Sequence, residues 1–316
     1  VSSMLYRDYD REEGEWVANE QGGRENVEAV GFLQELTSTV HRLYPGALMI
    51  AEESTAWPGV TRSTDEDGLG FDLKWNMGWM HDSLRYFQLD PLMRSGSHDT
   101  ITFHQWYAYD ERWVLPLSHD EVVHGKGSLL ARMPGDYTSQ LTQLRMLQLW
   151  QAAVPGRPLL FQGAEFGQGR EWDWRHSVDW HEAEDGQRRG VLGCLRQALR
   201  LYRELPALHL ADDERDGFRW VDCENRAESV IAFLRQAPHA DPVPAPVIAV
   251  FNFTPVPRPS YPLGIPDAVD WRVLQNSDAL DYGGQGYGPS DGDRVSPTGE
   301  GRDGWAGVIR VDLPPC

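Results

Sequence analysis

The segment Leu115–Lys126, with the sequence LPLSHDEVVHGK, constrains the fold more than any other part of the chain. A short apolar run that begins at Trp113 passes without a spacer into the polar side chains His119, Asp120 and Glu121. Such a run is typical of a strand that a parallel sheet buries on both faces. Chemistry in parallel α/β sheets takes place at the carboxyl ends of the strands. The segment therefore predicts a buried strand that ends at a candidate site.

Two other interpretations of this strand end stay open at the level of the residues. In the first, His119 and Asp120 simply satisfy each other's hydrogen bonds in a solvated turn. The second is a metal site, but His119 and His124 are five positions apart and would lie on different faces of a helix. We therefore expect no zinc at this position.

Composition limits the class of protein and its partners. A chain of 316 residues, 41% of them hydrophobic, is long enough for two domains and a sizeable core. A formal net charge of -19 repels phosphate backbones and anionic lipid, which disfavours nucleic-acid and membrane partners. A neutral substrate is compatible with this charge.

The cysteines and the apolar runs indicate a compartment. The three cysteines, Cys194, Cys223 and Cys316, are far apart and odd in number, which argues against a disulfide framework and for a reducing environment. The first residues carry no signal-peptide pattern, and a run of about 18 apolar residues occurs nowhere. We predict a cytoplasmic protein without a signal peptide or a membrane span.

Strands and helices alternate four times up to Pro206. The predicted strands cover residues 47–51, 71–75, 113–117 and 158–161, and the predicted helices cover residues 27–43, 78–92, 136–154 and 188–205. Alternation of this kind implies parallel strands with crossover helices. A closed (β/α)8 barrel needs eight such units and roughly 250 residues, so four units predict half a barrel.

Beyond Pro206 the pattern changes to short strands separated by Pro, Gly and Asp. The predicted strands include residues 230–234, 247–253, 271–274 and 308–313, and residues 283–304 form a long polar, glycine-rich loop. This pattern predicts an antiparallel β-sandwich. We place the domain boundary near residue 207, with domains at 1–206 and 207–316.

Two carboxylates follow predicted strands, Glu52 after residues 47–51 and Asp120 after residues 113–117. In a barrel-like sheet both would converge on one face. Glycoside chemistry uses such a pair, because one group protonates the leaving oxygen while another stays ionised against the developing positive charge. The alternative is that Glu52 and Glu53 are ordinary surface acids.

Eight segments, in order, resemble the glycogen branching enzymes of the α-amylase superfamily, which are retaining (β/α)8-barrel enzymes. They are VSSMLYRDY, EWVANEQGGREN, IAEEST, KWNMGWMHD, LPLSHDEVVHGK, RMPGDY, GAEFGQGREW and FNFTPVPR. The resemblance implies that Glu52 is the general acid/base, which donates the proton, and that Asp120 stabilises the transition state. It implies that His119 hydrogen-bonds hydroxyls of the transferred sugar. It implies no metal and no organic cofactor.

The chain departs from the family pattern at several points. The family's nucleophilic aspartate would precede Val1, so we expect the nucleophile to be absent from this chain and these residues alone to be inactive. The first four barrel units, the amino-terminal carbohydrate-binding domain and the last sandwich strand are also absent from the match. Ala164 replaces a common asparagine beside Glu165. The resemblance thus implies a carboxyl-terminal half barrel followed by a truncated sandwich.

The implied function is 1,4-α-glucan branching in glycogen biosynthesis. The enzyme would cleave an α-1,4 link in glycogen or an amylose-like chain and transfer the glucan to a 6-hydroxyl by a retaining double displacement. Two alternatives are a debranching or trehalose-releasing hydrolase of the same superfamily and a non-catalytic glucan-binding fragment. The chain has 13 tryptophans, and flat aromatic faces stack on sugar rings, although core packing explains them equally. We expect glucan contact from at least one of Trp57, Trp75 and Trp172.

Overall fold

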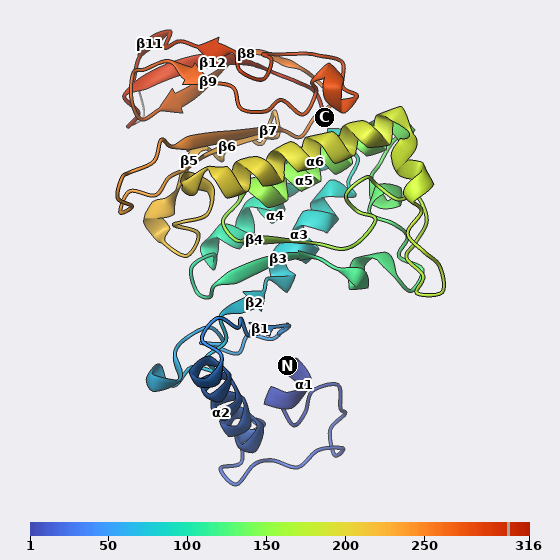
Figure 1. The fold of residues 1–316 in the computed structure, drawn as a ribbon, viewed down its shortest axis with the longest axis vertical. Coiled ribbons are helices and arrows are strands. Elements are labelled where there is room, and N and C mark those ends of the chain that lie inside the picture. Colours follow the sequence, from blue (N-terminus) through green and yellow to red (C-terminus); the bar gives the residue numbers. More distant parts are fainter. Residues whose placement is uncertain (302–303) are drawn as a thin grey trace. The chain divides into compact units, whose positions relative to one another are not determined.

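The computed structural model describes residues 1–301 and 304–316 (Figure 1). The chain divides into two compact units, the first made of residues 1–80 and 104–116 and the second of residues 81–103 and 117–316. Each unit has a hydrophobic core of its own. The predicted domain boundary near residue 207 rests on a different criterion, the change in sequence texture, and stays a prediction.

Four strands form one sheet in the order β1-β2-β3-β4, and the pairs β1–β2 and β2–β3 are parallel. They are β1 (Ile50–Ala51), β2 (Leu73–Trp75), β3 (Trp113–Leu117) and β4 (Arg157–Leu160). The predicted parallel sheet with crossover helices is confirmed. The first strand is shorter than expected, because the N–H of Met49 donates to the Asp72 side chain at 2.6 Å instead of to a neighbouring strand.

The first unit packs the helices α1 (Ser2–Leu5) and α2 (Val27–Leu43) against the start of the sheet. Asn26 caps α2, because its side chain accepts the N–H of Ala29 at 3.3 Å. The spacing of apolar residues predicted this helix with the same ends. The core of the first unit is formed by Leu5, Leu33, Ala51, Val60, Leu69 and Phe71. A short 3-10 helix covers Thr64–Glu66.

The helix that follows β2 is shorter than the predicted span of 78–92. It is α3 (Met77–Phe87), and a 3-10 helix at Pro91–Ser97 comes next. Proline cannot donate a helical hydrogen bond and disfavours helical backbone at the preceding residue. Asp90 instead begins the new turn by accepting the N–H of Leu92 at 2.9 Å. The chain continues through α4 (His98–Thr102) and further 3-10 helices at Phe103–Trp106, His119–Val122 and Leu130–Arg132.

Helices α5 (Tyr137–Ala153) and α6 (Gly186–Glu204) lie side by side in the second unit (Figure 1). The side chain of Asp136 caps α5 by accepting the N–H of Ser139 at 2.9 Å, as the sequence predicted. The predicted apolar face is buried: Leu141, Leu144, Leu147 and Trp150. Trp150 lies edge to face against Phe251 at 5.3 Å, so α5 packs directly on the following β-region. Short 3-10 helices lie at Trp180–Glu184, Pro206–Leu208, Arg215–Gly217 and Leu280–Tyr282.

The β-region is an antiparallel sandwich, as predicted (Figure 1). One sheet contains β5 (Phe218–Asp222), β6 (Val230–Arg235) and β7 (Val247–Asn252), and the other contains β8 (Arg258–Ile265), β12 (Gly307–Leu313) and β11 (Gly299–Glu300). Strands β9 (Trp271–Arg272) and β10 (Arg294–Val295) form a separate pair. Buried side chains from β6, β8 and β12 form the core: Val230, Ala232, Tyr261, Leu263, Ile265, Ile309 and Leu313.

The sequence analysis missed two features of the sandwich. Strand β8 contains Pro259 and Pro262, which argue against a strand, but β8 is at an edge of its sheet, where proline is tolerated. The predicted loop at 283–304 contains β10 and β11, because these segments pair with β9 and β12. Residues 302–303 of that loop lie outside the described part of the chain.

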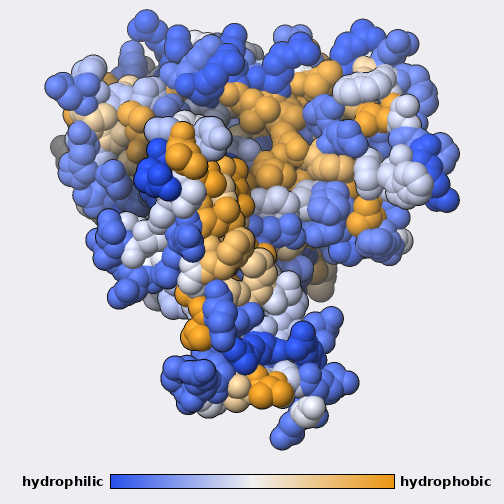
Figure 2. All heavy atoms as spheres, turned by 60° about the horizontal axis from the view of Figure 1, so that its bottom comes forward, coloured by the Kyte–Doolittle hydropathy of each residue, from blue (hydrophilic) through white to orange (hydrophobic). Residues whose placement is uncertain are grey.

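The surface is mostly hydrophilic, with apolar side chains gathered in patches (Figure 2). In the first unit, exposed apolar side chains occur on and after α2 and at β1: Phe32, Leu43, Tyr44, Leu48 and Ile50. Within residues 1–301 and 304–316, no helix has the length and apolar character to cross a membrane.

Candidate active site

The end of β3 turns sharply into the 3-10 helix His119–Val122 through a capping box. The Glu121 carboxylate accepts the backbone N–H of Ser118 at 2.7 Å and its hydroxyl at 2.8 Å. The hydroxyl in turn accepts the N–H of Asp120 at 3.3 Å. Glu121 is buried by these contacts, whereas the neighbouring Asp120 side chain is 40% exposed. The turn therefore fixes one acid inside and presents the other to solvent.

His119 and Asp120 lie together at this end of β3. The distance from His119 Nε2 to Asp120 Oδ1 is 3.2 Å, and 48% of the histidine side chain is exposed. His119 and Asp120 thus make the mutual contact expected for a solvated turn. Both side chains remain accessible, so the contact does not exclude a substrate.

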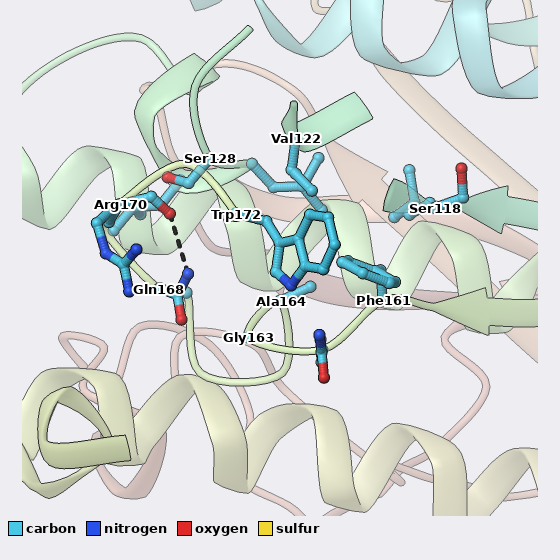
Figure 3. Close-up of a pocket in the computed structure, with 14 residues that line it drawn as sticks. Ser118, Val122, Ser128, Phe161, Gly163, Ala164, Gln168, Arg170 and Trp172 are labelled. Atoms are coloured by element: carbon cyan, nitrogen blue, oxygen red, sulfur yellow. Dashed lines mark hydrogen bonds between the residues drawn. The ribbon is translucent and has the colours of Figure 1, made fainter. Parts of the chain in front are cut away.

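Aromatic rings from the segment after β4 line the same site (Figure 3). The centroids of His119 and Phe161 are 5.9 Å apart, and Phe161 meets Trp172 edge to face at 5.2 Å. The N–H of Trp172 donates to the carbonyl of Val122 at 3.0 Å, which fixes the tryptophan beside the strand end. The pocket next to these rings has a free volume of about 20 Å³. It is large enough for about one water molecule, so a sugar ring would have to bind outside it.

The end of β1 carries Glu52 and Glu53 in the first unit. Glu52 is exposed, and Glu53 is buried with its Oε1 accepting the N–H of Thr55 at 2.5 Å. Among the residues that the structure describes, Glu53 Oε2 has no hydrogen-bond partner. Lys74 is buried nearby and donates to the carbonyl of Thr55 at 3.1 Å. Burial lowers the pKa of Lys74, while the charges of Glu111 and Glu53 oppose that shift.

The three candidate tryptophans are all partly buried. Trp57 lies edge to face on Tyr6 at 5.4 Å and packs on the core of the first unit, and Trp75 is part of β2. Three other tryptophans are much more exposed: Trp106 at 81%, Trp174 at 79% and Trp180 at 58%. Sequence reasoning missed these three, because proximity to a strand end does not report exposure. The strongly polar surroundings of Trp174, in the segment WDWRH, were the available signal.

The predicted site residues divide between the two units. His119, Asp120 and Trp172 come together in the second unit, and Glu52, Trp57 and Trp75 belong to the first. The convergence of Glu52 with Asp120 stays a prediction. Over residues 1–301 and 304–316, no three His, Cys, Asp or Glu side chains are grouped to hold a metal ion.

Comparison with known proteins shows which families the chain resembles. Residues 220–316 match the family model described as the alpha amylase C-terminal all-beta domain. All of this chain aligns with the 1,4-alpha-glucan branching enzyme GlgB of Pseudomonas aeruginosa, at 52% identity over 315 residues and 42% of that relative's length. The GlgB proteins of Ralstonia nicotianae and Dechloromonas aromatica are 50% and 49% identical over the whole chain, which covers 40% and 50% of them.

Over its whole length the chain is similar to 1,4-α-glucan branching enzymes. The chain spans between two fifths and half of the length of the curated relatives it matches. The recognition made from eight sequence segments is confirmed.

Solved structures share the fold of this chain. A cyclomaltodextrinase superposes with a TM-score of 0.57 at 18% identity. The superposition covers 90% of this chain and 42% of the cyclomaltodextrinase chain. Pullulanase type I from Bacillus subtilis, complexed with maltose, gives a TM-score of 0.59 at 14% identity. This superposition covers 91% of this chain and 42% of the pullulanase chain. At such identities the likeness concerns the fold alone.

Proposed function

We propose that the protein containing this chain is a 1,4-α-glucan branching enzyme of glycogen biosynthesis. It would cleave an α-1,4 link in glycogen or an amylose-like chain and join the released end to a 6-hydroxyl. The observation that carries the proposal is the 49–52% identity, over the whole chain, to relatives named 1,4-alpha-glucan branching enzyme. A neutral polysaccharide also suits a chain of net charge -19, whereas nucleic acid and anionic membrane do not.

The proposed proton donor is Glu52. It would protonate the glycosidic oxygen as the bond to the leaving glucan breaks, and then, as a carboxylate, take the proton of the attacking 6-hydroxyl. Its exposure at the end of β1 supports this role, because the proton must pass to and from bound substrate. The nucleophile that a retaining mechanism requires is not assigned to any residue of this chain.

The proposed transition-state stabiliser is Asp120, with His119 as the hydrogen-bond donor to a sugar hydroxyl. An ionised carboxylate stabilises the positive charge that develops on the sugar ring. The capping box supports this role, because it buries Glu121 and leaves Asp120 accessible beside the half-exposed histidine. The half-buried Trp172 and Trp57 are proposed as surfaces for glucan, with Trp75 as a third. We propose that the enzyme works in the cytoplasm, where its three free cysteines would remain reduced.

The test uses a full-length chimera in which these 316 residues replace the matching part of the Pseudomonas aeruginosa relative. Amylose is incubated with the chimera, and α-1,6 linkages are counted after complete digestion with a debranching enzyme. We expect new α-1,6 linkages, weaker iodine staining and no matching rise in reducing ends. Reducing ends without new branches would instead indicate a hydrolase. Glucan affinity without either product would indicate a non-catalytic glucan-binding protein, and both results would overturn the proposal.

A further inference from the structure

The loop at residues 123–127, which follows the candidate site, has an unusual backbone. The φ angles of His124, Gly125 and Gly127 are 59°, 80° and 77°, all in the left-handed region. Residues other than glycine rarely adopt these backbone angles, so His124 carries conformational strain. A loop of this kind keeps one conformation only when contacts from outside it determine that conformation.

Glu171, from the segment after β4, supplies such a contact. Its Oε1 accepts the N–H of Gly125 at 2.9 Å, and its Oε2 accepts the N–H of Gly127 at 2.7 Å. Backbone N–H groups that converge from left-handed residues form a concavity that suits an anion. The hydrogen bonds from Gly125 and Gly127 hold the pKa of Glu171 below its ordinary value, so the carboxylate is ionised at neutral pH.

Lys126 connects this clamp to the candidate site. It lies between the two glycines, and its Nζ donates to the backbone carbonyl of Asp120 at 2.6 Å. Its own carbonyl accepts Arg132 Nε at 3.2 Å, which holds the loop from the other side. The next residue after Glu171, Trp172, donates its N–H to Val122. The segment Glu171–Trp172 therefore holds both Val122, which precedes the loop, and the loop itself.

We propose that Glu171 is a positioning residue for the transfer reaction. It folds the loop at 123–127 around its carboxylate, and Lys126, held in that loop, fixes the backbone of Asp120. The Asp120 carboxylate thereby keeps the orientation in which it faces the reacting sugar. This inference rests on the proposed function, because it takes Asp120 as the transition-state stabiliser.

The decisive variant is Glu171→Gln in the full-length chimera. Glutamine keeps the size of the side chain, but its one oxygen can accept only one of the two N–H groups, and its amide nitrogen faces the other. We expect kcat for branching to fall about 10- to 100-fold, which is the cost of a small misplacement of a catalytic group. KM for amylose should change less than about twofold, because the charge of Asp120 acts mainly in the transition state.

Glu182→Gln provides a matched control. Glu182 also clamps a loop, because it accepts the N–H of Gly169 at 2.8 Å and pairs with Arg188. Within the part of the chain that the structure describes, it has no hydrogen bond to the loop at 123–127. We expect a lower melting temperature with kcat close to that of the parent. Equal losses of kcat in Glu182→Gln and Glu171→Gln would show that Glu171 is merely structural and would overturn the inference.

A second variant tests the link through Lys126. Lys126→Met should lower kcat by a similar factor, and the double variant should be no slower than the slower single variant, because both act on one path to Asp120. Multiplying effects would overturn the path. An inactive parent chimera would refute the proposed function, whereas an active parent with a fully active Glu171→Gln variant would refute this inference.

Discussion

The ends of β1 and β3 share one arrangement of acidic side chains but differ in the contacts that hold it. At each end an accessible carboxylate is followed by a buried one, Glu52 by Glu53 and Asp120 by Glu121. The two buried side chains are 1% and 3% exposed. In both places the buried acid anchors the turn, and the backbone then directs the preceding side chain outward. A pair of adjacent acids at a strand end thus combines a buried anchoring side chain with an accessible one.

The two anchors differ in where their partners come from. Glu121 is satisfied locally by Ser118, three positions earlier. Glu53 bonds one local N–H, and its charge also interacts with that of Lys74, which comes from the neighbouring strand β2. The buried acid at the end of β3 is therefore anchored by its own sequence, whereas the buried acid at the end of β1 also interacts with the neighbouring strand.

The largest expected effect belongs to the two accessible acids. Glu52→Gln and Asp120→Asn, each in the full-length chimera, should lower the branching rate about 100- to 10,000-fold, because each removes a proton-transferring or charged group. Melting temperatures should match that of the parent, since neither acid anchors its turn. Glu35→Gln, on the exposed side of α2, is the control with normal activity. Near-normal activity of either variant would remove its residue from the mechanism.

The next largest effect concerns the anchor of β1. Lys74→Met should lower the free energy of unfolding by about 3–5 kcal/mol, because it leaves buried carboxylates without their cation. Urea unfolding of the chimera measures this loss. Arg42→Met, on the exposed end of α2, should change stability by less than about 0.5 kcal/mol. A small loss in Lys74→Met would mean that Glu53 does not depend on Lys74.

The anchor of β3 should be less costly to remove. Glu121→Ala leaves the N–H and the hydroxyl of Ser118 without their acceptor, and we expect a loss of about 1–3 kcal/mol in the same urea experiment. A loss as large as that of Lys74→Met would end the distinction between a local and a sheet-dependent anchor.

The smallest expected effect concerns the aromatic residues near the two strand ends. Replacing Trp57, Trp75 and Trp172 together by alanine should weaken glucan binding severalfold, measured by affinity electrophoresis in gels that contain glycogen. The same gel with Trp174→Ala shows whether the more exposed ring contributes instead. Unchanged affinity and unchanged melting temperature in the triple variant would exclude all three residues as glucan contacts.

The sequence predicted best what depends on neighbours along the chain. Helix α5 was predicted from its Asp136 cap and its apolar spacing, and β3 from one apolar run. The contact of His119 with Asp120 was also foreseen, because the residues are adjacent. The clamp made by Glu171 joins positions more than 40 residues apart, and no local pattern announces it. The proline-containing β8 was missed because its tolerance for proline depends on its edge position.

The contacts of Arg94, a buried residue of the 3-10 helix Pro91–Ser97, determine how the second unit unfolds. Its buried guanidinium donates to the carbonyl of Phe87, to Gln143 of α5 and to the carbonyl of Phe253, just after β7. Three segments that are distant in the chain therefore share one cation, and none can leave without exposing the contacts of the others. The slowest amide hydrogens of α5 and β7 should exchange with solvent at the same rate, since a single opening event releases both.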